Sequence, residues 1–366
     1  MPHTTERPGP PSPTAHRPLP VHLVGSVPRP LCEDPTTAMG WFLDHRAGAE
    51  LTALPFDRDP RWVIDWLTHD LAEVPALEQV RSGASRGYDD MPCYRVRPGH
   101  RLQPADLAMD RPHLAEAAFA ALPMLDTSGL AESPRVQVGI PNALDRAMFA
   151  LGSPEAAREW LPVAQAAVVG EVTHLVARWG DRVRLQLESP ALLIAYHRTP
   201  RAAWTELTGQ LAQQVAGVLG AAPQARWVLH LCYGDLEHSP VFIPSDLESA
   251  VLFLNALTDV LVERRIPVPA VHLPVTYDSA APPTDPGFYD ALRRLRRGVE
   301  VIAGVVNETH PEESRHALDL VVEALGGPVA GVAAACGLGR RTVTAAAANM
   351  ELAGRLAHEW SAVATR

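Results

Sequence analysis

Trp227-Val228-Leu229-His230-Leu231-Cys232-Tyr233-Gly234-Asp235 is the stretch of sequence from which the fold can be inferred. Its apolar lead-in and its closing Gly-Asp turn signal predict a buried parallel strand that runs into a loop. Alternate residues of a strand face the same side, so the imidazole of His230 and the thiol of Cys232 point the same way. The pair could supply two ligands to one metal ion. A histidine packed beside a small buried thiol gives the same pattern, so the pair alone decides nothing.

Apolar runs of strand length recur along the chain and alternate with stretches of helical periodicity. Strands separated by helices indicate βαβ units and a parallel sheet. Eight such units predict a single α/β domain, a (β/α)8 TIM barrel. A doubly wound open sheet is the alternative, but no Gly-x-Gly-x-x-Gly follows the first strand. The predicted strands are 21–26, 49–55, 135–141, 183–190, 227–233, 268–275, 299–307 and 329–336.

Composition and low-complexity segments set the domain boundaries. Residues 1–20 are rich in proline and lack hydrophobic periodicity, so we expect a disordered tail. The barrel should span residues 21–366. Residues 76–110 are irregular and rich in Arg, Gly and Asp, which favours an insertion over one face.

The charge and the cysteine count exclude several classes of function. A formal net charge of −10 argues against a nucleic-acid or anionic-membrane partner. The chain shows neither a transmembrane run nor the apolar core of a signal peptide, so we expect a cytoplasmic protein. The oligomeric state cannot be inferred from the sequence. The 4 cysteines are few and far apart, which favours metal or nucleophile roles over disulfides.

Polar side chains stand at the predicted strand ends. In a TIM barrel the chemistry takes place where strands end and βα loops begin. A barrel selected for stability alone would not need so many polar groups there, so we predict an active site at this face. The residues are Ser26, Asp57, Asn142, Glu188, His230, Cys232, His272, Asn307 and Cys336.

Zinc is the metal that fits the donor types at this face. Zinc prefers four Cys and His ligands in a tetrahedron, and His230, Cys232 and Cys336 supply three. Their sequence spacing is too long for a zinc finger, so the barrel would have to bring them together. A buried cysteine in a glycine-rich turn is the alternative for Cys336.

Several collinear segments between residues 21 and 345 resemble the C-terminal barrel of the cobalamin-independent methionine synthase family, part of the uroporphyrinogen decarboxylase/methionine synthase-like superfamily. Each segment is modest alone, and their shared order makes the set specific. The segments are Gly25-Ser26-Val27-Pro28-Arg29, Leu185-Gln186-Leu187-Glu188-Ser189-Pro190-Ala191-Leu192, His230-Leu231-Cys232-Tyr233-Gly234, Gly304-Val305-Val306-Asn307 and Cys336-Gly337-Leu338.

The resemblance implies a zinc-dependent methyl or alkyl transferase that activates a small thiol as a metal-bound thiolate. The alkyl donor could be a methylated folate. Ser26 and Glu188 would anchor the acceptor, and His272 stands where the family has its glutamate zinc ligand. His310, with Asn307 beside it, could serve as the general acid, although a solvated loop histidine is an equal alternative. Tyr233 could stack on a flat ring, or simply pack in the core.

Two departures from the family pattern affect the expected substrate. The family's Asp-Glu pair is here Glu188-Ser189, and its Gly-Glu near the second strand is missing from 54–59, where Arg58 brings a positive charge. An inward-facing Arg58 would suit a substrate bearing a carboxylate, phosphate or sulfonate. A metal-free lyase or decarboxylase on the same barrel, or a non-catalytic metal- or ligand-binding barrel, are the alternative functions.

Overall fold

The computed structural model describes residues 19–363 except 86, 88–89, 235–239 and 278–279. The predicted disordered tail, 1–20, therefore lies almost entirely outside the described residues.

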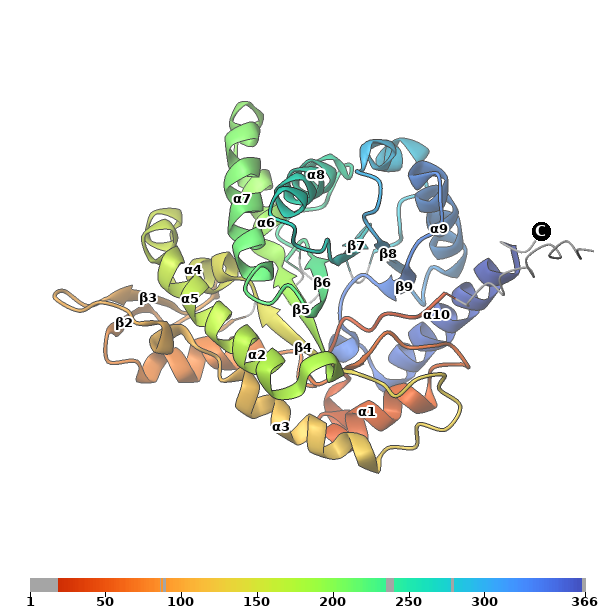
Figure 1. The fold of residues 1–366 in the computed structure, drawn as a ribbon, viewed down its shortest axis with the longest axis horizontal. Coiled ribbons are helices and arrows are strands. Elements are labelled where there is room, and N and C mark those ends of the chain that lie inside the picture. Colours follow the sequence, from red (N-terminus) through yellow and green to blue (C-terminus); the bar gives the residue numbers. More distant parts are fainter. Residues whose placement is uncertain (1–18, 86, 88–89, 235–239, 278–279, 364–366) are drawn as a thin grey trace, which may run out of the picture.

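A curled sheet of seven parallel strands forms the centre of the molecule (Figure 1). Strands β4 and β8 are buried along their whole length, as expected when helices cover one face of a sheet and the barrel interior the other. The order in the sheet follows the chain, so each strand pairs with its predecessor through a helical crossover. The strands are β1 (Leu54–Pro55), β4 (Val136–Pro141), β5 (Val183–Ser189), β6 (Arg226–Leu231), β7 (Ala270–Pro274), β8 (Val301–Val306) and β9 (Gly331–Ala334).

The two edges of this sheet meet at Val21, which forms parallel bridges with both Leu51 and Val332. The Val21 amide donates to the Glu50 carbonyl at 2.8 Å. The predicted first strand, 21–26, thus contributes one bridging residue instead of a full strand. The α/β prediction is confirmed, and the eight-stranded barrel is confirmed in part, as a TIM-like barrel.

Helices surround the strands on the outside (Figure 1). They follow the strands in the alternation that the sequence predicts, except that a 3-10 helix, Pro286–Arg294, connects β7 to β8. The helices are α1 (Pro35–Asp44), α2 (Trp62–Asp65), α3 (Arg111–Ala121), α4 (Ala143–Leu151), α5 (Pro154–Trp179), α6 (Pro190–Arg198), α7 (Trp204–Leu219), α8 (Glu248–Glu263), α9 (Pro311–Leu325) and α10 (Val343–Val363).

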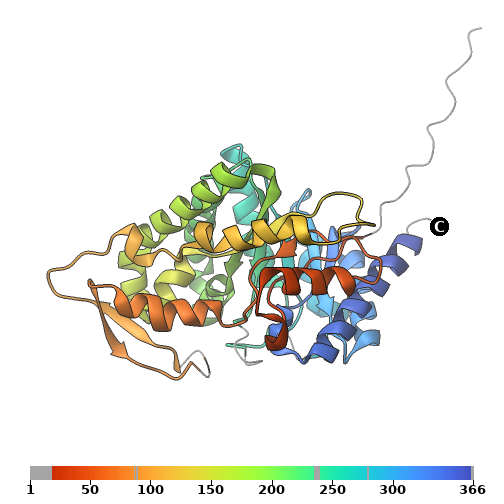
Figure 2. The same cartoon turned by 90° about the horizontal axis from the view of Figure 1, so that it is seen from below.

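A small antiparallel hairpin stands apart from the barrel strands. It pairs β2 (Leu77–Arg81) with β3 (Cys93–Val96). Figure 2 shows it at the opposite end of the molecule from α10. The hairpin falls within the predicted insertion, 76–110.

Two buried ion pairs tie the segment after this hairpin to the barrel. Arg146 of α4 pairs with Glu171 of α5 at 2.5 Å, and Glu171 also accepts the backbone amides of Met109 and Arg111. The Arg111 guanidinium pairs in turn with Asp57 and donates to the Gly139 carbonyl. The chain leading into α3 is therefore fixed against the strand ends.

Helix α5 lies within a segment, Pro154–Arg182, that is long and apolar enough to cross a membrane by length and composition. In the structure α5 packs on α4, β4, β5 and α7 and buries the ion-paired Glu171. These contacts are typical of a helix that covers a barrel. The absence of a membrane partner stays a prediction.

Candidate metal centre and cavity

Three of the four predicted metal ligands come together at the carboxyl ends of the strands. His230 is in β6, Cys232 follows the same strand, and Cys336 lies two residues beyond β9. Their donor atoms all lie within 4.8 Å of one another. Two thiols and one imidazole at this separation are a donor set that suits zinc. The barrel thus joins groups that are more than a hundred residues apart in the sequence.

His272 does not join this cluster, contrary to its prediction as the fourth ligand. Its Nε2 lies 3.0 Å from the carbonyl oxygen of Ala334, and its Nδ1 lies 2.6 Å from Nδ1 of His230. A carbonyl only accepts, so Nε2 of His272 carries the proton and Nδ1 is the acceptor. Both ring nitrogens of His272 are therefore engaged in hydrogen bonds.

The protonation of His230 follows from this arrangement. Burial holds the pKa of His272 well below its ordinary value, so the ring is neutral. His230 must then donate its Nδ1 proton to His272, which leaves Nε2 of His230 to face the cavity. A metal-binding histidine commonly donates its other ring N–H in this way.

Charges around the cluster favour the thiolate form of Cys336. A hydrogen bond with Cys232, joined by the hydrogen bond of His230 and the charge of Arg340, holds the pKa of Cys336 well below its ordinary value despite burial. The Arg340 guanidinium lies 3.6 Å from the Cys336 sulfur. A thiolate, not a thiol, is the metal ligand, so the site is electrostatically prepared for a cation.

A cavity of about 150 Å³ opens beside these donors. It combines the candidate metal ligands, a group of carboxyl side chains and apolar walls. Its lining includes Ser26, Asp57, Trp62, Ile64, Met91, Pro141, Asp145, Phe149, Glu188, Pro190, His230, Cys232, Cys336 and Arg340.

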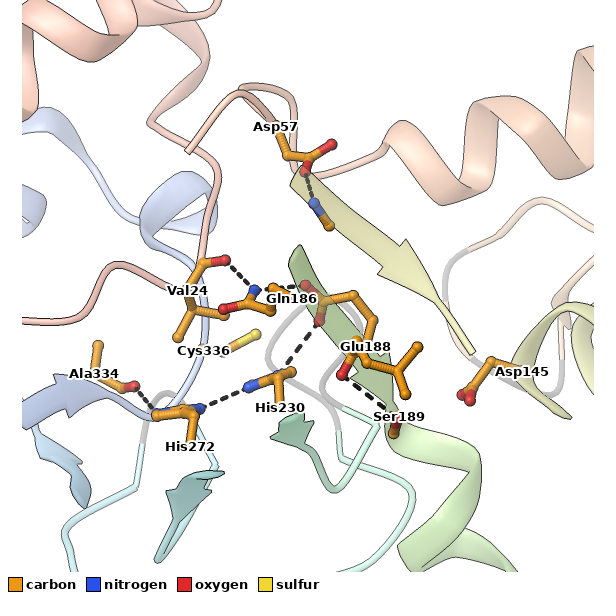
Figure 3. A network of polar contacts seen from close by, with 12 residues as sticks. Val24, Asp57, Asp145, Gln186, Glu188, Ser189, His230, His272, Ala334 and Cys336 are labelled. Atoms are coloured by element: carbon orange, nitrogen blue, oxygen red, sulfur yellow. Dashed lines mark hydrogen bonds and ion pairs between the residues drawn. The ribbon is translucent and has the colours of Figure 1, made fainter. Parts of the chain in front are cut away.

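Glu188 is a predicted substrate anchor that lies beside His230, one of the candidate metal ligands. Its Oε2 is 3.7 Å from Nε2 of His230, and its Oε1 accepts from Gln186 at 2.6 Å (Figure 3). Burial raises the pKa of Glu188 to about 7. The carboxyl group is therefore only partly ionised near neutral pH, and can accept or donate a hydrogen bond to a ligand.

Ser26 also lies where the sequence predicts, at the wall of the cavity. Its φ of 40° is in the left-handed region, which non-glycine residues seldom adopt outside functional sites. Its Oγ accepts from the amide of Gly339 at 3.2 Å. A Cβ on Gly337 or Gly339 would lie 2.6 or 2.7 Å from this oxygen, so the turn after Cys336 requires both glycines.

Two other predicted substrate contacts, Arg58 and Tyr233, do not line the cavity. Arg58 donates to the carbonyl of Cys32 at 2.9 Å. The Tyr233 hydroxyl is buried and donates to the carbonyl of Pro274 at 2.8 Å. Tyr233 therefore has the core role that the sequence left open. The substrate-binding role of Arg58 stays a prediction.

The predicted catalytic pair, Asn307 and His310, belongs to the turn into α9 and is likewise not part of the cavity lining. The Asn307 side chain accepts from Thr309 and donates to the carbonyl of Ala280. His310 precedes the first residue of α9 and is partly exposed. Their catalytic role stays a prediction.

Sequence reasoning missed Asp145, a cavity-lining carboxyl group in the first turn of α4. A helical position one turn beyond a strand end was the available signal. Asp57, in contrast, was identified as a strand end, but its charge is balanced by Arg111 and by the Gly139 amide at 2.8 Å.

Comparison with solved structures shows that the chain has a known fold. No protein-family model matches the chain, and no curated protein sequence is significantly similar to it. A B12-independent methionine synthase from Shewanella sp. W3-18-1, solved with selenomethionine, is similar over 95% of this chain and 99% of its own, with 13% identity and a TM-score of 0.59. A putative vitamin B12-independent methionine synthase from Listeria monocytogenes is similar over 89% and 86%, with 13% identity and a TM-score of 0.50. The chain therefore has the fold of the B12-independent methionine synthases, as the sequence motifs predicted.

Proposed function

We propose that the protein is a zinc-dependent alkyltransferase that moves a methyl or other alkyl group from a small-molecule donor to a small thiol. The observation that carries the proposal is the convergence of His230, Cys232 and Cys336 at the carboxyl ends of the barrel strands. The fold shared with B12-independent methionine synthases supports it independently.

The donor set fits zinc, and the three side chains leave one tetrahedral position for a substrate. Bound zinc would supply Lewis acidity, which lowers the pKa of a substrate thiol while leaving its sulfur nucleophilic. In the transfer, a bond forms between this sulfur and the alkyl carbon. The bond between that carbon and the donor's leaving atom breaks, and the leaving atom keeps the electron pair.

The protein's own side chains would position the two substrates. Glu188 can accept a hydrogen bond from a polar group on the thiol, because its carboxyl faces the cavity beside His230. The apolar walls, which include Trp62 and Phe149, exclude water from the reacting atoms. A methylated folate, which the family resemblance implies, is one donor to test.

Thiol binding to the metal gives a direct test of this function. The zinc-loaded protein should release about one proton per bound thiol, and X-ray absorption should show about one added sulfur ligand. A panel of homocysteine, cysteamine, 2-mercaptoethanol and 3-mercaptopropionate covers cationic, neutral and anionic tails. If no thiol in the panel changes the metal shell, thiol alkylation is wrong.

His272 should orient His230 for metal binding instead of binding the metal itself. Removing the second partner of a ligating histidine weakens metal binding by roughly 10–100-fold. We therefore expect His272→Ala to lower zinc affinity by that factor in competition with a chromophoric chelator. His272→Gln, whose amide oxygen can still accept from His230, should recover part of the loss.

His316→Ala is the matched control, because His316 is exposed on α9. It should leave zinc affinity unchanged. Equal affinities for wild-type protein and His272→Ala would show that the hydrogen bond between the two imidazoles does not support the metal site.

A further inference from the structure

Asp145 is a buried carboxyl group that lacks half of its expected partners. Its side chain is only 1% exposed, and one oxygen, Oδ1, accepts from the Ala191 amide at 2.7 Å. The other oxygen, Oδ2, is buried without a hydrogen-bond partner among the residues that the structure describes. An unpaired polar atom in such a place is costly, because it loses its hydrogen bonds with water.

Other buried carboxyl groups near Asp145 have the partners that Asp145 lacks. Asp57 is paired with Arg111, and Glu171 is paired with Arg146. Glu188 accepts from Gln186 and lies near His230. Among the described residues, Asp145 has no basic partner, and its Oδ2 accepts no hydrogen bond. Burial raises its pKa well above the ordinary value, and the charge of Glu188 adds to the shift.

The unpaired group belongs to the cavity beside the metal ligands. Asp145, Phe149 and Glu188 all line this cavity. In Figure 3 the Asp145 carboxyl lies on the far side of Glu188 from Cys336. The basic side chain in the lining, Arg340, sits at the other end, beside the Cys336 sulfur. The Asp145 end of the cavity therefore presents carboxyl oxygens and apolar walls.

We propose that Asp145 recognises a positively charged nitrogen of a substrate. This nitrogen would donate a hydrogen bond to Oδ2. The inference rests on the alkyltransferase function proposed above, and adds that one of the two substrates carries an ammonium group. Two sources share this chemistry: an ammonium tail on the thiol, or the cationic nitrogen from which the alkyl group leaves. Asp145 and Glu188, which lie apart in Figure 3, would then contact different groups.

The test uses Asp145→Asn, which keeps the shape and the acceptor for the Ala191 amide but removes the charge. Two probe pairs, measured by calorimetry on the zinc-loaded protein, distinguish the sources. Tighter binding of cysteamine than of 2-mercaptoethanol would indicate that the site recognises an ammonium group on the thiol. Protonated N,N-dimethylbutylamine against butanol reports a cationic donor whose N–H can reach Oδ2, and it needs no thiol chemistry.

The wild-type protein should prefer the cation of at least one pair, and Asp145→Asn should reduce that preference by roughly 10–100-fold, the range of a charge-assisted contact. Asp319→Asn, the same substitution at an exposed position of α9, should leave it unchanged. A thermal midpoint at or above the wild-type value would show that Asp145→Asn folds, as expected when an unpaired buried acid is removed.

Each remaining outcome decides one of the two proposals. If thiols bind the zinc but neither cation is preferred, or if Asp145→Asn weakens cationic and neutral probes equally, the role of Asp145 is wrong and the alkyltransferase stands. If no thiol binds but protonated N,N-dimethylbutylamine binds through Asp145, the alkyltransferase is wrong and the cation site stands.

Discussion

Cys336→Ser should reduce the zinc content of the purified protein to about a tenth of an equivalent or less, against about one in the wild type. A serine hydroxyl stays protonated at neutral pH, so it cannot replace the thiolate that Cys336 provides. Two donors, His230 and Cys232, would remain, which is too few for a stable site. Elemental analysis of protein purified without added metal measures the effect.

Cys93→Ser is the matched control for this loss. Cys93 is a half-buried free thiol in β3, outside the cluster of donor atoms. Its substitution should leave the zinc content at the wild-type level. Zinc retained in Cys336→Ser at the level of Cys93→Ser would contradict the assignment of the metal centre, and with it the proposed chemistry.

The convergence of His230, Cys232 and Cys336 could be predicted because it depends on simple geometric rules. A spacing of two along a strand puts His230 and Cys232 on one face, and a barrel collects the ends of its strands at one rim. Cys336 follows the last strand, so it reaches the same rim. These inferences need the order and type of the elements, but not their detailed packing.

The role of His272 depended on strand register, which the sequence does not reveal. His230 and His272 are direct partners across the parallel pair β6 and β7. Side chains in register stand side by side, so the two imidazoles contact each other instead of converging on a third point. A shift of one residue would have turned His272 to the opposite face.

Side-chain contacts in loops and helices were the other feature that could not be predicted from the sequence. The sequence left open whether Arg58 faces the cavity, and in the structure it donates to the carbonyl of Cys32. Asp145 was missed because it lies in a helix, where residue type alone does not distinguish a cavity wall from solvent. The predicted first strand is reduced to a bridge at Val21, and the chain turns soon after, at Gly25 and Ser26, both with positive φ.

Arg146→Met should lower the free energy of unfolding by about 3–5 kcal/mol, because it leaves a buried carboxylate without its partner. Arg146 is fully buried, and Glu171 is nearly so. Arg146 also donates to the carbonyl of Leu107 at 3.0 Å, so the segment that leads to Arg111 would lose an anchor. Urea unfolding, with the slope compared between variants, measures the change.

A second variant separates the lost ion pair from a general packing defect. Arg146→Met combined with Glu171→Leu removes both charges, so it should recover much of the stability lost in the single variant. The exposed pair of Arg296 and Asp259, 3.0 Å apart, provides the comparison, since breaking it should cost less than about 1 kcal/mol. If Arg146→Met cost no more than Arg296→Met, the buried pair would not hold α4 against α5. Asp145, next to Arg146 in the chain, would then need another explanation for its fixed position at the cavity wall.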